Sequence, residues 1–340
     1  MNLKEDLKTV QAKFEEDPLD CFIYHSTYQP ILKILLTNQC QKRCAYCINN
    51  CRTNYFRYQL DPLKLSKEFI MMYKKKKVKG LFVSSAIYKD ANFSQEKILE
   101  TLTILRKKFN YFGYLHAKIL PNADFSLIKE LFKYADRLSI NLEFPAQKYL
   151  SQVSSKNLFE DLMKRLKFLA KINKEKKIKS GITTQFVVGA LEETDQEILS
   201  LTQFLYQNLN LKMVHYSGFQ PIKGTPLENK LKVNPLRIKR LYEASILLRD
   251  YGFKYKDFLY DERGNLILDT PVKDLSVIKN KKMFPININK AERFLLLRIP
   301  GIGKMKANKI VSLRKQKKIT SFKDLEKIGI PKKAEGWICF

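Results

Sequence analysis

Residues 31–47 read ILKILLTNQCQKRCAYC, and this stretch decides how the rest of the chain is interpreted. Its first seven residues are mostly aliphatic, which predicts a buried strand. The loop that follows holds Cys40, Cys44 and Cys47 in a C-x3-C-x2-C spacing, with Tyr46 directly before the last cysteine. Three thiolates on one short loop can converge on one metal centre, and three ligands leave one iron of a four-iron cluster open.

A structural zinc knuckle is the alternative interpretation of these cysteines, with Cys51 as its fourth ligand. Zinc sites usually combine two pairs of cysteine or histidine ligands. No second pair follows downstream, and the chain has only three histidines. The spacing therefore favours an iron–sulfur centre with an open coordination position, and Cys51 is interpreted as a packing residue.

On both sides of this loop, short apolar runs alternate with longer amphipathic patterns. The alternation predicts parallel βαβ units, about six in all, which could form an open sheet or a partial barrel. Asp61, before Pro62, and Ser94 are expected to begin helices. Strands are expected at residues 31–37, 81–84, 114–119, 138–142, 183–188 and 213–216, and helices at 62–76, 94–108, 124–134, 156–176, 194–209 and 236–251.

Polar residues gather at the ends of the predicted strands, where such folds carry their chemistry. Strand alternation puts Ser139, Asn141 and Glu143 on one face of the fourth strand. These three polar groups are candidates for hydrogen bonds to ribose hydroxyls. His116 and Lys118 share a face of the third strand, and Lys118 is either a ligand for a carboxylate or phosphate or a solvated lysine at the rim.

The charge balance favours a polyanionic partner. Lys and Arg total 63 against 34 Asp and Glu, so the formal net charge is 63 − 34 = +29. No apolar run approaches the roughly 18 residues of a membrane span. Residues 1–20 are charged and amphipathic, without the apolar core of a signal peptide. We expect a cytoplasmic protein that does not contact membranes.

The C-terminal part contains FLLLRIPGIGKMKANKIVSLR at residues 294–314. A turn with Gly301 and Gly303 leads into a helix, whose first N–H groups form an anion site beside Lys304, Lys306 and Lys309. Residues 324–334 are a second, weaker copy of this pattern. The sequence thus predicts an N-terminal helical extension at 1–27, a core at 28–283 and a small all-α domain at 284–340.

The cysteine loop resembles that of the radical S-adenosylmethionine (SAM) superfamily, whose hallmark is the same spacing with an aromatic residue before the last cysteine. The resemblance implies a partial (β/α)6 TIM-like barrel, a [4Fe–4S] cluster on the three cysteines, and SAM, which is cleaved to a 5′-deoxyadenosyl radical. It also implies which residues contact the cofactor: Tyr46, Ser84 and Ser85 (where relatives often have Gly-Gly-Glu), Ser139, Asn141, Glu143, Gly189 and Phe219.

The C-terminal pattern resembles the helix-hairpin-helix motif of DNA repair proteins, which grips phosphates without reading bases. Together the two halves resemble a subfamily of radical enzymes assigned to DNA modification or repair and found with a uracil-DNA-glycosylase-like partner. The resemblance implies an enzyme acting on DNA, supplied with electrons by a donor such as flavodoxin or ferredoxin. Two alternatives remain: a radical enzyme that modifies tRNA, and a non-catalytic iron–sulfur DNA-binding protein with Cys51 as fourth ligand.

Overall fold

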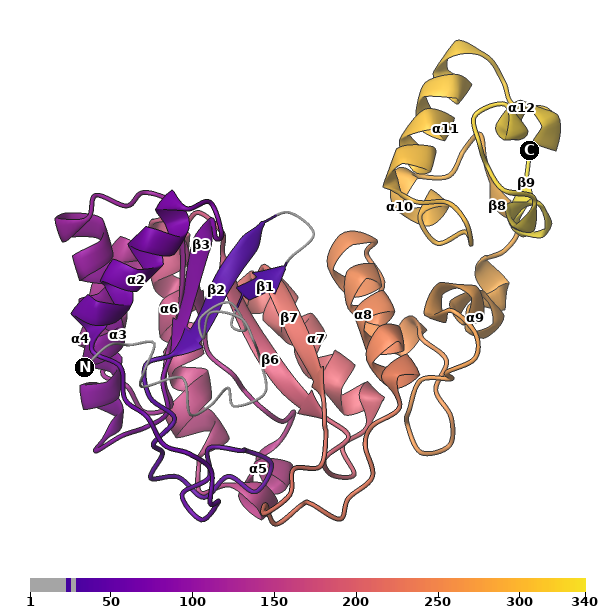
Figure 1. The fold of residues 1–340 in the computed structure, drawn as a ribbon. Helices are drawn as coiled ribbons and strands as arrows, with labels where there is room; N and C mark the ends of the chain where they lie inside the picture. Colours follow the sequence, from indigo (N-terminus) through magenta and orange to yellow (C-terminus); the bar gives the residue numbers. More distant parts are fainter. Residues whose placement is uncertain (1–22, 26–28) are drawn as a thin grey trace. The chain divides into compact units, whose positions relative to one another are not determined.

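One curved sheet dominates the computed structural model, which describes residues 23–25 and 29–340 (Figure 1). Its strands follow one another in sequence order, and all neighbours are parallel except the first pair. The six parallel strands form the expected partial TIM-like barrel. The strands are β1 (Ile23–His25), β2 (Pro30–Leu35), β3 (Gly80–Ser84), β4 (Tyr114–Lys118), β5 (Arg137–Ser139), β6 (Ile182–Val188) and β7 (Met213–Gly218).

Helices cover the outer face of this half-barrel because every second strand residue there is apolar. Leu32, Leu81 and Leu115 are fully buried under the helices, whereas Phe82 and His116 face the inner side and stay partly exposed. The helices are α2 (Pro62–Lys74), α3 (Ala91–Thr103), α4 (Phe125–Tyr134), α5 (Gln147–Val153) and α6 (Lys164–Glu175). The π-helical turns Ile104–Lys108 and Leu158–Met163 extend α3 and precede α6.

Two helix starts test the predicted caps. Asp61 caps α2 as expected, accepting a hydrogen bond from the Lys64 N–H at 2.9 Å. The prediction for Ser94 was wrong, because α3 begins at Ala91 and Asp90 is its cap. The Ser94 hydroxyl instead donates back to the Asp90 carbonyl within the first turn, at 3.0 Å.

The chain divides into two compact units, described here one at a time. The first comprises the chain up to Glu192 and Leu209–Val233, and it holds all seven strands of the large sheet. The second comprises Glu193–Asn208 and Asn234–Phe340. It contains most of α7 (Asp195–Leu209) and all of α8 (Pro235–Asp250) and α9 (Val272–Lys279). In the part of the chain that the structure describes, no helix has the length and apolar character of a membrane span.

The boundaries of these two units differ from the domain boundary that the sequence predicts between residues 283 and 284. Polar contacts explain why residues before 284 pack with those after it. Arg298 pairs with Asp257 at 2.9 Å, and the Lys273 ammonium donates to the Ile302 carbonyl at 2.6 Å. At the other end of the chain, residues 23–25 of the expected helical extension form β1, and residues 1–22 and 26–28 lie outside the described part.

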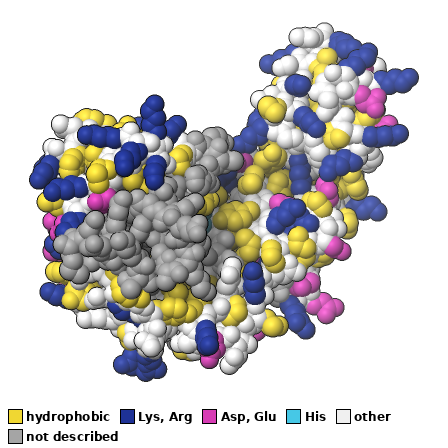
Figure 2. Space-filling view, in the orientation of Figure 1, with side chains coloured by type: hydrophobic (Ala, Val, Ile, Leu, Met, Phe, Trp, Pro, Cys, Tyr) yellow, Lys and Arg dark blue, Asp and Glu magenta, His cyan; other side chains and the backbone are white. Residues whose placement is uncertain are grey.

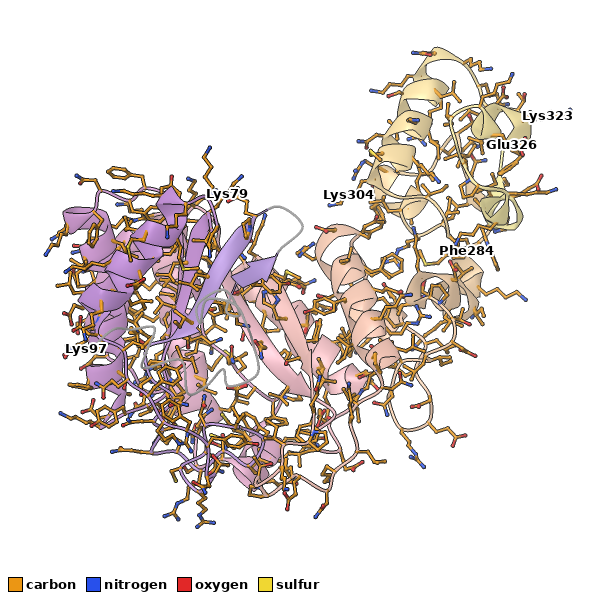
Figure 3. The ribbon with its side chains drawn as sticks, viewed as in Figure 1. Lys79, Lys97, Phe284, Lys304, Lys323 and Glu326 are labelled. Carbon is orange, nitrogen blue, oxygen red and sulfur yellow. The ribbon has the colours of Figure 1, made fainter. Side chains whose placement is uncertain are left out.

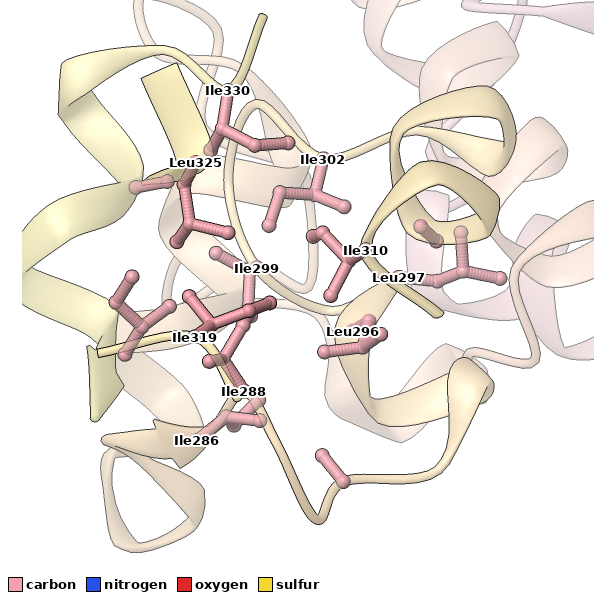
Figure 4. Close-up of a cluster of buried hydrophobic side chains, with 14 of the residues drawn as sticks. Ile286, Ile288, Leu296, Leu297, Ile299, Ile302, Ile310, Ile319, Leu325 and Ile330 are labelled. Atoms are coloured by element: carbon pink, nitrogen blue, oxygen red, sulfur yellow. The ribbon is translucent and has the colours of Figure 1, made fainter. Parts of the chain in front are cut away.

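The C-terminal region builds its own apolar core (Figure 4). Its helices are α10 (Arg293–Leu296), α11 (Lys304–Gln316) and α12 (Phe322–Glu326), followed by a 3₁₀ helix at Lys332–Trp337. The region is helical as predicted, with one addition: β8 (Ile286–Asn287) pairs in parallel with β9 (Ile338–Cys339). Branched aliphatic side chains fill the core, among them Leu296, Ile299, Ile302, Ile310, Ile319 and Leu325.

Candidate active site

Residues 38–57, here called the cysteine loop, follow β2 and are held together by polar side chains. The Arg57 guanidinium donates to the carbonyls of Asn38 at 2.8 Å, Asn50 at 2.6 Å and Thr53 at 2.9 Å. The buried Asn50 amide donates to the Cys44 carbonyl at 3.1 Å. Because the loop has little regular structure, these bonds satisfy backbone groups that a helix or sheet would otherwise pair.

The three predicted ligands occupy this loop as free thiols. Cys44 is buried, and Cys40 and Cys47 are partly buried. Burial raises the pKa of Cys47 to about 11, with a smaller contribution from the neighbouring Cys44 and Cys40, although a hydrogen bond to the backbone of Asn49 opposes the shift. The Cys44 sulfur lies 3.3 Å from the Ser154 hydroxyl. Cys51 is exposed.

Tyr46 connects the cysteine loop to the polar end of the fourth parallel strand. Its hydroxyl accepts a hydrogen bond from the Lys156 ammonium at 3.1 Å, and that ammonium lies 3.5 Å from the Glu143 carboxylate. Burial by itself lowers the pKa of Lys156, but the Tyr46 oxygen and the Glu143 carboxylate outweigh it and raise the pKa above its usual value. Lys156 is therefore a cation at neutral pH.

Glu143 sits in an unusual backbone conformation, with a φ of +67°. Its N–H donates to the Gln185 carbonyl at 3.0 Å, and its own carbonyl accepts from the Val187 N–H at 2.7 Å. These bonds to β6 hold a residue in the left-handed region, which is costly for a side chain with a Cβ. Such a conformation is typical of residues whose side chain must point in a required direction.

The other polar residues predicted for this strand line up beside Glu143. The Asn141 amide nitrogen lies 3.5 Å from the Glu143 carboxylate, and its oxygen accepts a short hydrogen bond from the Lys118 ammonium. The Ser139 hydroxyl and His116 Nε2 are 2.8 Å apart. The structure thus places Asn141 beside Glu143 and Lys118, in a polar row that reaches Ser139 at the end of β5. Strand alternation does not account for this row, because β5 ends at Ser139.

The remaining predicted cofactor contacts lie at other strand ends. Ser84 ends β3, where its carbonyl accepts from the Leu36 N–H at 2.8 Å. The buried Ser85 hydroxyl donates to the Ala86 carbonyl at 2.8 Å, so it is engaged locally. Gly189 follows β6 with a φ of +84°. Phe219 follows β7 and is buried.

A cavity of about 840 Å³ fills the inner side of the half-barrel. Cationic and aromatic side chains dominate its described lining, among them Lys33, Phe82, Tyr114, Lys118, Arg137 and His215. Figure 3 labels Lys79, which lines the cavity next to β3, and Lys97, which projects from α3. The lining also includes Asn141 and Ser139, so the cavity reaches the polar row that ends at Glu143.

The potential inside this cavity is positive. Burial lowers the pKa of Lys118 to about 8. Burial also lowers the pKa of His215 to about 4, helped by the positive charges of Arg137, Lys118 and Lys33. Burial and Lys118 likewise hold the pKa of His116 well below its usual value. Both histidines are therefore neutral at pH 7, chiefly because burial disfavours the charged form and also because the surrounding cations oppose further positive charge.

The predicted DNA-binding residues lie in the second unit, at the turn before α11. Gly301 has a φ of +81°, and Gly303 is the N-cap of α11. The lysine side chains contact other parts of the same unit: Lys304 pairs with Asp250 at 3.2 Å, Lys306 donates to the Gly301 carbonyl at 3.2 Å, and Lys309 lies 3.4 Å from the Ile328 carbonyl.

Gly301 also has a packing role that the sequence did not indicate. A Cβ at this position would lie 2.4 Å from Cγ of Pro331, in the second copy of the motif. The two copies therefore pack closely against each other at Gly301. The second copy is shorter, since its hairpin leads into the 3₁₀ helix Lys332–Trp337 instead of an α-helix.

These features define a class of protein before any comparison: a partial TIM-like barrel with a three-cysteine loop after its first parallel strand. Comparison with known families agrees, since residues 34–205 match the Radical SAM superfamily and residues 282–334 match the helix-hairpin-helix motif. The chain belongs to the radical SAM superfamily. Members of this superfamily use a [4Fe–4S] cluster and SAM, which favours an enzyme over the non-catalytic alternative.

The relatives found by sequence similarity match only part of this chain. The uncharacterized protein MJ0785 of Methanocaldococcus jannaschii is 28% identical over 214 residues, which are 60% of this chain and 52% of that protein. Biotin synthase of Thermodesulfovibrio yellowstonii is 27% identical over 206 residues, 59% of this chain and 61% of that protein. The chain thus spans between about half and three fifths of the length of these relatives.

Solved structures support the fold. The FeFe-hydrogenase maturase HydG from Carboxydothermus hydrogenoformans superposes with a TM-score of 0.51 at 12% identity, covering 88% of this chain and 80% of that one. At this identity the similarity concerns the fold alone.

The donor set suits the cluster that the superfamily uses. In the described residues, no three Cys, His, Asp or Glu side chains surround the position of one metal ion. A four-iron cluster does not require such a position, because each cysteine binds a different iron and the sulfurs stay farther apart. Three free thiols on one loop could hold three irons of such a cluster.

Sequence reasoning missed several residues of this site. Arg57 and Lys156 lie in segments without a motif, and only the folded chain brings them to the cysteine loop and to Glu143. Lys33 and His215 could have been found from strand alternation, since both lie on the inward face of predicted strands.

Proposed function

We propose that this chain is a radical SAM enzyme that modifies or repairs bases in DNA. The observation that carries the proposal is the presence, in one chain, of a cysteine loop on a half-barrel and a helix-hairpin-helix region. The net charge of +29 supports a nucleic-acid partner. Figure 2 shows Lys and Arg side chains spread over the surface of both units, with few acidic ones between them.

In this proposal Cys40, Cys44 and Cys47 hold the cluster. When bound, the cluster and SAM supply a 5′-deoxyadenosyl radical that takes a hydrogen atom from the substrate. The chain's own residues orient SAM. Tyr46, next to Cys47 in the sequence, would shield the cluster, and the carboxylate of Glu143, held by Lys156, would accept hydrogen bonds from ribose hydroxyls.

The other predicted contacts complete the SAM site in the same proposal. Asn141 and Ser139 extend the polar row toward the cavity. Ser84 and Ser85 meet the methionine end through backbone oxygens, since the Ser85 hydroxyl is already engaged. Gly189 lets the adenine approach the backbone, and Phe219 packs at the last strand end.

The hairpin before α11 is proposed to bind the DNA backbone. The first N–H groups of α11 have no acceptor one turn earlier in the helix, and they favour an anion together with the positive end of the helix. Gly303 lets a phosphate approach these groups. Lys304, Lys306 and Lys309 would exchange their present contacts for phosphate oxygens (Figure 3 labels Lys304). Such contacts give affinity without sequence specificity.

A base inside a duplex cannot reach the inner side of a half-barrel, so the target must be single-stranded or flipped out of the helix. Reduction of the cluster requires a one-electron donor, for which flavodoxin or ferredoxin is proposed. A uracil-DNA-glycosylase-like partner and a place in the cytoplasm belong to the same proposal.

The test is to purify the full chain without oxygen, reduce it, add SAM, and measure 5′-deoxyadenosine by chromatography with and without DNA. We expect DNA to increase the product. A parallel arm replaces DNA by tRNA, and a stronger response to tRNA would replace our proposal by the tRNA-modifying alternative. A protein with full iron content whose product formation responds to neither nucleic acid would contradict the proposed substrate class.

A Cys51→Ala variant is the control for cluster ligation. Because Cys51 is exposed and lies outside the C-x3-C-x2-C spacing, we expect this variant to keep its iron content and its SAM cleavage. A Cys47→Ala variant should lose both.

A further inference from the structure

The lining of the half-barrel cavity carries a surplus of positively charged side chains. Five cationic side chains belong to its described lining: Lys33, Lys79, Lys118, Arg137 and Lys179. Asp136 is the one carboxylate in that lining, and it is paired with Arg106 at 2.7 Å. No ion pair joins the five cations to a carboxylate of the described residues, so their charge is not neutralised within the described part of the chain.

Three of these cations lie beside aromatic rings of the cavity. The Phe82 and His116 rings stack at 4.0 Å between centroids. The Lys33 ammonium lies 5.7 Å and the Lys118 ammonium 5.9 Å from the centre of the Phe82 ring. Arg137 lies 5.8 Å from the Tyr114 ring. Cations that converge beside aromatic faces suit a ligand with an anionic group and a flat ring.

We propose that this cavity binds a single nucleotide of a DNA strand, with its phosphate between Lys33, Lys118 and Arg137 and its base against Tyr114 and Tyr24. This inference rests on the proposed function and names the part of the substrate that enters the half-barrel. The volume of about 840 Å³ lies in the range of about 300–1,000 Å³ that holds ligands of this size.

Two further observations support a polar, anionic occupant. Burial, and after it the positive charges of Lys118, Arg137 and Lys33, lowers the pKa of both His116 and His215, and these same charges would stabilise an anion. Thr183, on β6, also lines the cavity, and its buried hydroxyl has no hydrogen-bond partner among the described residues. An unpaired buried hydroxyl is costly, which suits a group that completes its bonding with a ligand.

The polar row gives the cavity a direct connection to the cysteine loop. Lys118 donates to Asn141, Asn141 approaches Glu143, and Lys156 joins Glu143 to Tyr46. A nucleotide held at Lys118 would therefore lie next to the SAM site proposed above. Small carboxylates would satisfy the cations equally well, but they have no flat ring to pack against the side chains of Tyr24 and Tyr114.

The experiment compares Lys33→Met with Lys67→Met in the full, cluster-loaded chain. Both changes remove one positive charge. Lys67 is an exposed residue of α2, a helix on the outer face of the sheet, so it lies away from the cavity. The probe is a fluorescent single-stranded trideoxynucleotide, and its binding is followed by anisotropy. A second probe has the same bases joined by uncharged methylphosphonates, and malonate serves as a competing carboxylate.

We expect Lys33→Met to weaken binding of the charged probe by about tenfold, since charge-assisted hydrogen bonds are the strong ones, and Lys67→Met to leave it nearly unchanged. The methylphosphonate probe should bind weakly to every variant. Equal affinity of the two variants for the charged probe would overturn the proposal. Displacement by malonate at concentrations similar to the probe's own would overturn the nucleotide assignment and point to a small acid.

Failure of this inference is distinguishable from failure of the proposed function. If DNA raises 5′-deoxyadenosine formation equally in wild type and Lys33→Met, the enzyme acts on DNA and the cavity assignment alone is wrong. If DNA has no effect on the wild type, the proposed function itself is wrong, whatever the cavity binds.

Discussion

Glu143 lies where the polar row of the sheet meets the cysteine loop, and its carboxylate depends on one lysine. The buried Lys156 ammonium is shared between that carboxylate and the Tyr46 hydroxyl. Removing one member of a buried charged pair leaves the other without compensation. Lys156 is thus a positioning residue for both Glu143 and Tyr46.

We expect Lys156→Met to weaken SAM binding by about tenfold, because an unpaired Glu143 would turn away from its present direction. Lys156→Arg should restore part of the affinity by keeping the charge. SAM affinity can be measured by equilibrium dialysis, with iron content as a check that the cluster is intact. Unchanged SAM affinity at full iron content would show that Lys156 has no positioning role.

The lowered pKa of His215 predicts that the folded protein becomes less stable as the solution becomes acidic. Between pH 6.5 and about pH 4 the unfolded chain binds a proton on this side chain that the folded chain does not. The unfolded state therefore gains stability as the pH falls through this window, and folding loses about 2–3 kcal/mol from His215 alone. At pH 7 both states are neutral at this residue, and the contribution disappears.

His215→Gln should remove this part of the acid destabilisation. We expect the denaturant midpoints of wild type and variant to converge as the pH falls from 6.5 to 4.5, or the variant to become the more stable protein. Parallel curves for the two proteins over that range would contradict the assigned pKa shift.

At the scale of an element, the hairpin before α11 has a matched control within the chain. Gly301 and Gly329 have nearly the same φ, +81° and +84°. A Cβ at Gly301 would lie 2.4 Å from Pro331, whereas a Cβ at Gly329 would meet nothing within 4 Å. The two sites therefore share the conformational cost of an alanine and differ only in packing.

Gly329→Ala should destabilise the second unit by about 1 kcal/mol, the cost of a left-handed conformation. Gly301→Ala should cost about 2–4 kcal/mol, because the overpacking against Pro331 adds to it. Denaturant unfolding of the full chain measures both. Equal losses at the two sites would show that Pro331 moves aside without cost. For the same reason, substitutions at Gly301 test folding as well as DNA binding.

Most of the half-barrel could be predicted from the sequence, because its strands and helices carry strong local patterns. All six predicted strands are present, β5 ending three residues early, where Glu143 turns the chain. The short β1, α5 and the β8–β9 pair were missed, since elements of so few residues form through tertiary contacts. The three cysteines are predicted as cluster ligands from their spacing, whereas Arg57 and Lys156 act through contacts between distant segments.

For the molecule as a whole, the net charge predicts how strongly DNA binding should depend on salt. With a net charge of +29, binding should weaken steeply as salt rises, because each phosphate contact releases counterions. Lys309→Met should reduce the slope of log affinity against log salt by about 1, since this exposed lysine of α11 has only a long contact to a backbone carbonyl to lose.

Lys67→Met on α2 is the control for this measurement and should leave the slope unchanged. Duplex DNA of one length, titrated by anisotropy at several salt concentrations, gives both slopes. If both lysines changed the slope equally, affinity would depend on total charge, and the hairpin would have no special part in it.

The pairing of Ile286 with Ile338 has a consequence for how this protein could be rearranged. It places the two ends of the C-terminal region side by side, so the region enters and leaves at one point. A segment closed in this way can be cut out and grafted as a cassette, or circularly permuted by joining its ends and opening a loop elsewhere. Because Arg298 and Lys304 also pair with Asp257 and Asp250, a chimaera between radical enzymes should carry residues 234–340 as one piece.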